Sequence, residues 1–280
     1  MPEANMKPHG RIVEEIVSSQ LPAELSERIS KEALENDEIY RRRSFDTLDL
    51  SQTHYAHRQM LNWAFQHLPS LGGARVLDIG VGEGQSSVIM ARSGAQVTGI
   101  DVSGEALERA RELARRCGVV PEFLRMAGEE LHFSNESFDA ILCMSAFHHM
   151  DLDRASREFV RVLRRGGRVV MIEPLATNPP AWLYRHVGRL FAREATSEET
   201  PLKVSDLKVL RKYFRRVQWQ GMFLMSVALF GLDRIVGNSN AVVHSLSESA
   251  FKFVSPLDSV ILRIPGLQRF AWKIGVIAEL

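Results

Sequence analysis

Val76-Leu77-Asp78-Ile79-Gly80-Val81-Gly82-Glu83-Gly84 carries the strongest structural signal in the chain. An apolar run that ends in Asp-x-Gly-x-Gly-x-Gly is typical of a buried strand turning sharply into a helix, because glycine tolerates a positive φ and lets a ligand approach the backbone. The next apolar run, residues 95–101, ends in Asp101. Its carboxylate can accept hydrogen bonds from two ribose hydroxyls. The pairing predicts a nucleoside site in an α/β fold.

The spacing of the glycines favours a nucleoside that carries no phosphate. A dinucleotide fingerprint has its third glycine three residues after the second, where this chain has Gln85. The loop contains no Arg or Lys to attract a phosphate, and Glu83 would repel one. A P-loop is excluded because no Gly-Lys-Ser/Thr follows.

Residues 71–175 alternate between strand and helix patterns, which predicts a parallel sheet with right-handed crossovers. The apolar runs predict strands at 75–79, 96–101, 122–126, 138–144, 167–173, 217–223 and 270–279. The helical spacing predicts helices near 85–93, 104–117 and 154–163. Ligands of such sheets bind at the carboxyl ends of the strands, which is where the motifs fall.

Taken in order, these motifs resemble the class I S-adenosylmethionine-dependent methyltransferases, specifically the group similar to the ubiquinone/menaquinone-biosynthesis (methyltransferase type 11) enzymes. The resemblance covers roughly residues 71–173 and rests on the glycine loop, Asp101, Gly128-Glu129-Glu130-Leu131-His132-Phe133, Ser137-Phe138-Asp139 and Phe147-His148-His149-Met150. It implies a Rossmann-like, doubly wound, seven-stranded sheet, mostly parallel, with an antiparallel last strand inserted beside an edge strand. It also implies S-adenosyl-L-methionine as cofactor.

The resemblance assigns cofactor contacts residue by residue. Asp78 would contact the methionine amino group, Val102 would pack on adenine, and the backbone at Met144 would face the methionine end. The full predicted set is Asp78, Gly80, Gly82, Gly84, Asp101, Val102, Gly128, Glu129 and Met144. The chain departs from the family at Ala127, where an Asp usually accepts the adenine amino hydrogen. A single neutral hydrogen bond contributes only about 0.5–1.5 kcal/mol, so this departure leaves the cofactor assignment standing.

His148 and His149 are the candidate catalytic residues, since a histidine near its ordinary pKa can take a proton from a hydroxyl. A role in lining the pocket is the alternative. No metal site is expected, because adjacent residues point apart and no third ligand has suitable spacing. Glu173, at the end of a predicted strand, is expected at the pocket mouth.

The pattern predicts two parts of the chain. Residues 1–70 form a helical extension, with helices at 11–19, 24–36 and 59–67, and residues 71–280 form the core. The extension is either a lid over the active site or a solvated decoration; as a lid it would bring Tyr40, His54 and Tyr55 to the pocket.

An unusually apolar insertion spans about residues 223–266 of the core. Its longest apolar run falls far short of the roughly 20 residues that a bilayer span needs. A greasy substrate pocket, a homodimer face and a peripheral membrane contact are the open alternatives. The basic residues Arg211, Lys212, Arg215 and Arg216 precede it and suit a membrane surface.

The composition of the chain argues against several classes of protein. A net charge of +1 draws the protein to neither nucleic acid nor anionic membrane as a whole, and 45% hydrophobic residues suffice for one large core. Cys117 and Cys143 suggest no disulfide framework, and the first residues lack the apolar core of a signal peptide. A cytoplasmic location is expected.

The sequence therefore predicts methyl transfer to a small, lipophilic metabolite, with O- or C-methylation favoured. One alternative acceptor is a nucleic acid or protein, suggested by arginine clusters such as Arg41–Arg43, although no aromatic-basic stacking platform accompanies them, so no nucleic-acid partner is expected. Another alternative is a noncatalytic, cofactor-binding partner in an assembly.

Overall fold

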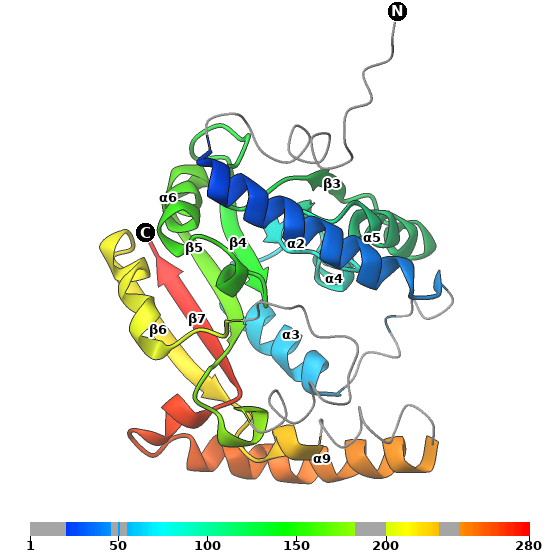
Figure 1. Ribbon diagram of the computed structural model, residues 1–280, viewed down its shortest axis with the longest axis vertical. Coiled ribbons are helices and arrows are strands. Elements are labelled where there is room, and N and C mark those ends of the chain that lie inside the picture. Colours follow the sequence, from blue (N-terminus) through cyan, green and yellow to red (C-terminus); the bar gives the residue numbers. More distant parts are fainter. Residues whose placement is uncertain (1–20, 46–49, 51–54, 183–199, 230–240) are drawn as a thin grey trace, which may run out of the picture.

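The computed structural model describes residues 21–45, 50, 55–182, 200–229 and 241–280. Within these ranges, one seven-stranded sheet has the strand order β3-β2-β1-β4-β5-β7-β6 (Figure 1). The strands are β1 (Arg75–Ile79), β2 (Gln96–Asp101), β3 (Glu122–Arg125), β4 (Phe138–Met144), β5 (Leu163–Pro174), β6 (Arg216–Met222) and β7 (Lys273–Glu279).

The predicted fold class is confirmed. Strands β1 to β5 pair in parallel, and β7 lies antiparallel between β5 and the edge strand β6. The strand expected at 167–173 begins earlier, because Leu163 already pairs with Phe138 before the register shifts. The last strand begins later than expected, because the short 3₁₀ helix η7 (Leu267–Phe270) precedes it.

Six α-helices lie within the described ranges: α2 (Ala23–Arg41), α3 (Tyr55–His67), α4 (Gln85–Arg92), α5 (Gly104–Arg116), α6 (Leu152–Val162) and α9 (Ala241–Ile261). Short 3₁₀ helices include η3 (Phe147–His149), η4 (Val204–Lys208) and η5 (Leu210–Lys212). The helix expected at 11–19 lies outside the described residues. The helix expected at 24–36 runs on to Arg41.

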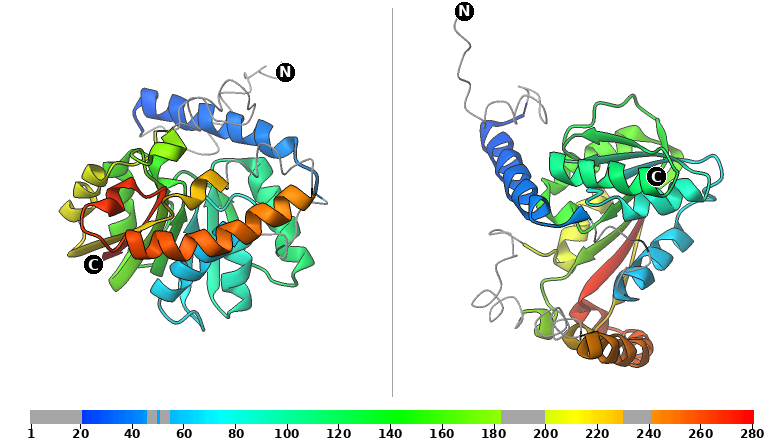
Figure 2. Two further views of the ribbon diagram at one scale, coloured as in Figure 1. Left: turned by 90° about the horizontal axis from the view of Figure 1, so that it is seen from below. Right: turned by 90° about the vertical axis from the view of Figure 1, so that its right-hand side faces the viewer.

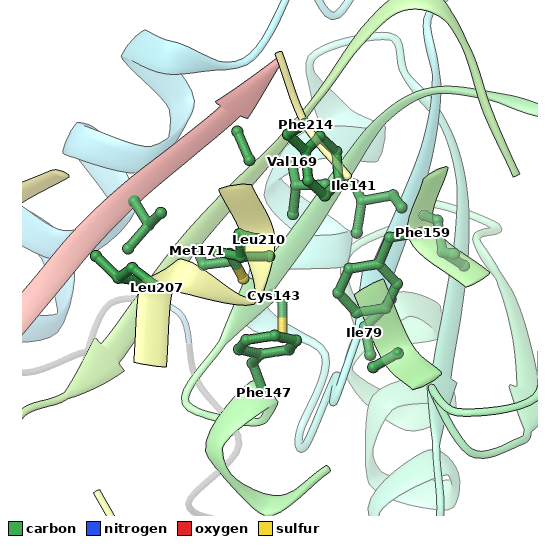
Figure 3. Packing of buried hydrophobic residues seen from close by; sticks show 14 of the residues in the cluster. Ile79, Ile141, Cys143, Phe147, Phe159, Val169, Met171, Leu207, Leu210 and Phe214 are labelled. Carbon is green, nitrogen blue, oxygen red and sulfur yellow. The ribbon is translucent and has the colours of Figure 1, made fainter. Parts of the chain in front are cut away.

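Side chains alternate between the two faces of the central strands, so both faces are buried. On one face α6 and the 3₁₀ turns after residue 203 pack on the sheet. Figure 3 shows this cluster, in which Phe147 and Phe159 pack with Ile79 and Cys143. Cys143 is fully buried and forms no disulfide, which agrees with its expected role as a small core residue.

Helices α3 and α4 cover the opposite face. Met60 and Ala64 of α3 pack with Val76, Leu142 and other inner-strand residues. Trp63 lies over Gly275 of β7, where a Cβ atom would come within 2.5 Å of the indole ring. Although α3 falls within the expected extension, it belongs to the helical layer of the sheet, and α2 is the element that crosses the carboxyl ends of the strands (Figures 1 and 2).

Within the described residues, no helix is long and apolar enough to cross a membrane. Helix α9 instead lies along one end of the molecule, at the far side from α2 (Figure 1).

Phe159→Ala should lower the free energy of unfolding by about 3–5 kcal/mol, because the ring is fully buried and its removal leaves a cavity. Phe253→Ala is the matched control, since that ring is 80% exposed and its loss should change stability by about 0.5 kcal/mol or less. Urea denaturation measures both; equal effects would contradict the assignment of Phe159 to the core.

Candidate active site

A cavity of about 340 Å³ opens at the carboxyl ends of β1, β2 and β4, beneath α2. This volume lies in the range of small-molecule sites. The lining includes eight of the residues that the sequence singled out: Gly80, Gly82, Asp101, Val102, Gly128, Glu129, Met144 and His149. The structure therefore brings most of the predicted site to one place.

The glycine loop follows β1 and has no room for side chains. The Gly80 amide donates to the Ile100 carbonyl at 2.8 Å, and both Gly80 and Gly82 have positive φ. A Cβ atom on Gly80 would lie 2.4 Å from the Ala146 methyl, and one on Gly82 would lie 2.9 Å from the Tyr40 hydroxyl. The bare backbone leaves a cradle that fits a nucleoside.

Asp101 ends β2 beside this loop, as predicted. Its Oδ2 accepts the Gly82 amide and its Oδ1 accepts the Ser103 amide, each at 2.9 Å. Burial raises the pKa of Asp101, and these amides oppose the rise. Because each carboxylate oxygen can accept two hydrogen bonds, each keeps capacity for a further donor. The held carboxylate thus fits a ribose with two adjacent hydroxyls.

Two predicted cofactor residues lie outside the lining and shape the loop from behind. Asp78 is buried, and its Oδ2 accepts the hydroxyls of Ser86 and Ser87, each at 2.6 Å. Burial raises the pKa of Asp78 to about 6. Gly84 lies at the start of α4, where a Cβ atom would come within 2.7 Å of Ala110. Direct cofactor contacts by these two residues stay predictions.

The histidine pair lies in η3, after β4, and is anchored to Glu173 of β5 through His148. The Nδ1 of His148 lies 2.6 Å from Glu173 Oε2, and Glu173 also accepts the amides of Ala146 and Phe147. Glu173 is fully buried, so its expected place at the pocket mouth is wrong. Burial acts to raise the pKa of Glu173, but His148 and the amide bonds outweigh it and the pKa is lowered.

His149, unlike His148, lines the cavity. The two rings are stacked with centroids 4.0 Å apart. Burial, and then the charge of His148, lower the pKa of His149 to about 4. Its imidazole is therefore neutral near pH 7, and it binds a proton less tightly than a free histidine does.

Helix α2 is fixed over the cavity by polar contacts near both ends. Arg28 donates to the carboxylate of Glu129 and to the backbone carbonyl of His149. Farther along, Asp37 accepts the Ser103 hydroxyl at 2.6 Å, at the N-terminus of α5, where a negative charge is favourable. The predicted lid position is thus occupied by α2.

Arg109 of α5 joins the glycine loop to the chain that follows α2. The guanidinium is 1% exposed and donates to Glu83 at 2.9 Å. It also donates to the carbonyls of Arg43 and Ser44, at 2.7 and 2.9 Å. Glu83, which the sequence showed as a charge unfavourable to phosphate, therefore has a structural partner.

Glu32 is the main cavity residue that the sequence did not single out. It lies on α2, 3.6 Å from Arg28 and 3.7 Å from Nδ1 of His149. Burial raises its pKa to about 8, with Arg28 opposing and Glu129 adding to the rise. In the sequence, Glu32 four residues after Arg28 has the pattern of an ordinary surface ion pair. Only the packing of α2 over the strand ends reveals it.

The remaining sequence-predicted residues have mixed positions. Tyr40 lines the cavity, whereas Tyr55 packs edge-on against Phe251 of α9, and His54 lies outside the described residues. Ala127 is fully buried against Ile29 and Ala33 of α2, so the small residue lets that helix approach. Among the described residues, no cluster of three or more His, Cys, Asp or Glu could hold a metal ion.

Glu32→Gln should stabilise the protein increasingly between pH 4.5 and about 8. The pKa is higher in the folded chain than in the unfolded one, so the folded state loses stability as pH rises through this window, and an uncharged amide avoids that loss. Thermal unfolding across this pH range measures the effect. Glu27→Gln, at an exposed residue of the same helix, is the control. If the stability of both variants depends on pH in the same way, burial of the Glu32 carboxylate is not the cause of the effect.

Comparisons with known proteins agree with this geometry. Residues 77–171 match a family model described as a methyltransferase domain. A ubiquinone biosynthesis O-methyltransferase of Bordetella parapertussis is 34% identical over 153 residues, which are 52% of this chain and 64% of that protein. The chain thus spans less than two thirds of the length of this curated relative.

Solved structures share the fold. The [4+2]-cyclase SpnF is 22% identical with a TM-score of 0.55, covering 79% of each chain. A geranyl diphosphate C-methyltransferase from Streptomyces coelicolor A3(2) is 17% identical with a TM-score of 0.52, covering 80% of this chain and 78% of that one. Since the first name states a cyclisation, the likeness in fold identifies the architecture and not the reaction.

The domain match, the relatives and the strand order agree with one another. Residues 77–171 are thus similar to a methyltransferase domain, and the strand order of the sheet agrees with that match.

Proposed function

We propose that this protein transfers a methyl group from S-adenosyl-L-methionine to a small, lipophilic metabolite, at oxygen or carbon. One observation carries the proposal: Asp101, held to receive a ribose, and His149, neutral at pH 7, line the same cavity. The name of the Bordetella relative states O-methylation, and that of the Streptomyces structure states C-methylation, which supports these two acceptor atoms.

The residues of the cavity have separate roles in the proposed reaction. The bound cofactor supplies an electrophilic methyl group. Asp101 and the glycine loop hold its nucleoside, and α2 excludes water from the space between cofactor and acceptor. His149 takes the proton from an acceptor hydroxyl, and His148, held by Glu173, supports the ring of His149 from behind.

The lining supports a lipophilic acceptor. Apolar side chains from α2, the strand ends and η3 contribute much of the wall, among them Ile29, Met126, Met144 and Met150. Acidic groups alternate with them, including Glu32 and Glu129. Such a wall suits a cationic cofactor beside an uncharged, apolar acceptor.

Contact with a membrane or with a second copy of the chain concerns the residues after position 223 and does not depend on the cavity. A cytoplasmic location stays a prediction.

The decisive experiment is transfer of labelled methyl groups from the cofactor into an extract of producing cells, followed by separation into organic, aqueous and macromolecular fractions. Label in the organic fraction is the expected result. Label in macromolecules would replace the acceptor by a nucleic acid or protein. Absence of label despite measured cofactor binding would favour the noncatalytic partner.

Asp101→Ala should weaken cofactor binding by about 1.5–3 kcal/mol, roughly 10- to 100-fold in Kd, since it removes hydrogen bonds to a charged group. Titration calorimetry measures the change. Asp153→Ala removes an acid on the outside of α6 and should leave the affinity unchanged. An Asp101 variant that binds like the intact protein would refute the ribose assignment.

His149→Ala should reduce the transfer rate about 100-fold or more while cofactor affinity stays within twofold of the intact protein, because its ring serves the acceptor's proton. His132→Ala, at an exposed histidine away from the cavity, should change neither value. Loss of cofactor binding in the His149 variant would instead mark this residue as structural.

A further inference from the structure

Helix α9 has a face that the cofactor site does not use. It lies along the end of the molecule farthest from α2, and Figure 2 shows it from below and from the side. With 21 residues the helix is about 30 Å long. Its inner face binds the body of the protein, and its outer face points away from it.

The inner face is firmly attached. Asp258 is buried and accepts the amides of Leu224, Met225 and Ser226 at 2.8–3.0 Å, together with the Ser226 hydroxyl at 2.6 Å. Phe251 is buried between Tyr55 and Phe223, with ring centroids 6.0 and 5.3 Å away. These contacts fix the rotation of the helix, so its outer face is a defined surface.

The outer face carries large apolar side chains in one row, which we call the outer stripe. They recur at helical spacing of three, four or seven residues and are between 61% and 80% exposed: Leu246, Phe253, Leu257 and Val260. A helix on the surface of a monomeric protein normally presents polar residues there. A contiguous apolar row of this kind marks a contact surface.

The charges around the outer stripe identify the partner. Between residues 245 and 270, every exposed charged side chain is basic: Lys252, Arg263 and Arg269. Of the acids of this segment, Asp258 is buried, and Glu248 pairs with Arg58 at 2.9 Å and with Lys252 at 3.9 Å. A stripe of Phe, Leu and Val followed by exposed arginines matches the boundary between acyl chains and anionic headgroups.

A second copy of the chain fits this face less well. In a symmetric dimer the same patch meets itself, so the basic residues of one copy would meet a patch whose exposed charged side chains are also basic. Anionic lipid supplies opposite charge to all of them. The apolar stripe alone would suit a second copy of the chain or a membrane, and the basic residues beside it favour the anionic membrane.

We propose that α9 lies in the plane of an anionic membrane surface, with the outer stripe inserted among the lipids and Arg263 and Arg269, which follow the end of the helix, contacting acidic headgroups. The inference stands on α9 alone and does not require methyl transfer.

Vesicle flotation of the full chain tests the proposal. The intact protein should float with vesicles of phosphatidylglycerol and phosphatidylcholine, and not with phosphatidylcholine alone. Phe253→Ser/Leu257→Ser should lower the partition at least about tenfold, because two buried apolar side chains are lost from the contact. Val120→Ser is the matched control, at a fully exposed apolar residue between α5 and β3, and should float like the intact protein.

Two further variants test whether vesicle binding requires the basic residues. Arg263→Glu should weaken flotation and reduce its salt sensitivity, whereas Arg165→Glu, at a 97% exposed side chain away from α9, should not. Failure of the intact protein to float, equal flotation on neutral vesicles, or an undiminished Phe253/Leu257 variant would overturn the proposal. So would a dimer in analytical ultracentrifugation that the double variant dissociates. Flotation needs no cofactor, so this result is read independently of the transfer assay.

Discussion

The hydrogen bond from the Gly82 amide to the Asp101 carboxylate is the contact on which the rest of the site depends. It joins the loop after β1 to the end of β2, and it holds a carboxylate at the edge of the cavity in spite of the cost of burial. Because β1 pairs in parallel with both β2 and β4, the carboxyl ends of three strands meet at this point. The parallel pairing of β1 with its two neighbours therefore sets both the strand order and the position of the site.

Charged contacts then decide what covers the site. Arg28 connects α2 to Glu129 and to the chain at His149, so the same residues that line the cavity also hold its cover. Glu32 is brought near His149 by this packing, with a pKa raised by burial. Burial lowers the pKa of His149 and raises that of Glu32, so both groups favour their uncharged forms.

Apolar side chains form a buried core in one part of the molecule and an exposed surface in another. The sheet faces bury their side chains within the protein, as Ile79 and Cys143 do. Helix α9 buries only one face, through Phe251 and Asp258, and leaves the other exposed. The cofactor site and the surface proposed for lipid contact thus lie on different elements, so each can be changed without disturbing the other.

The sequence by itself determined the strands and the core of the site. Local patterns suffice there: an apolar run before Gly80 and another before Asp101 define strand ends, and in a parallel sheet strand ends meet. The tertiary structure alone decided which polar groups are buried. Glu173 and Glu32 are both ordinary acids in the sequence, yet one accepts His148 and two amides inside the core, and the other lines the cavity beneath α2. Burial and its effect on a pKa arise from contacts between residues on different elements, from 25 positions apart for His148 with Glu173 to 101 for Arg28 with Glu129, and a local pattern does not contain them.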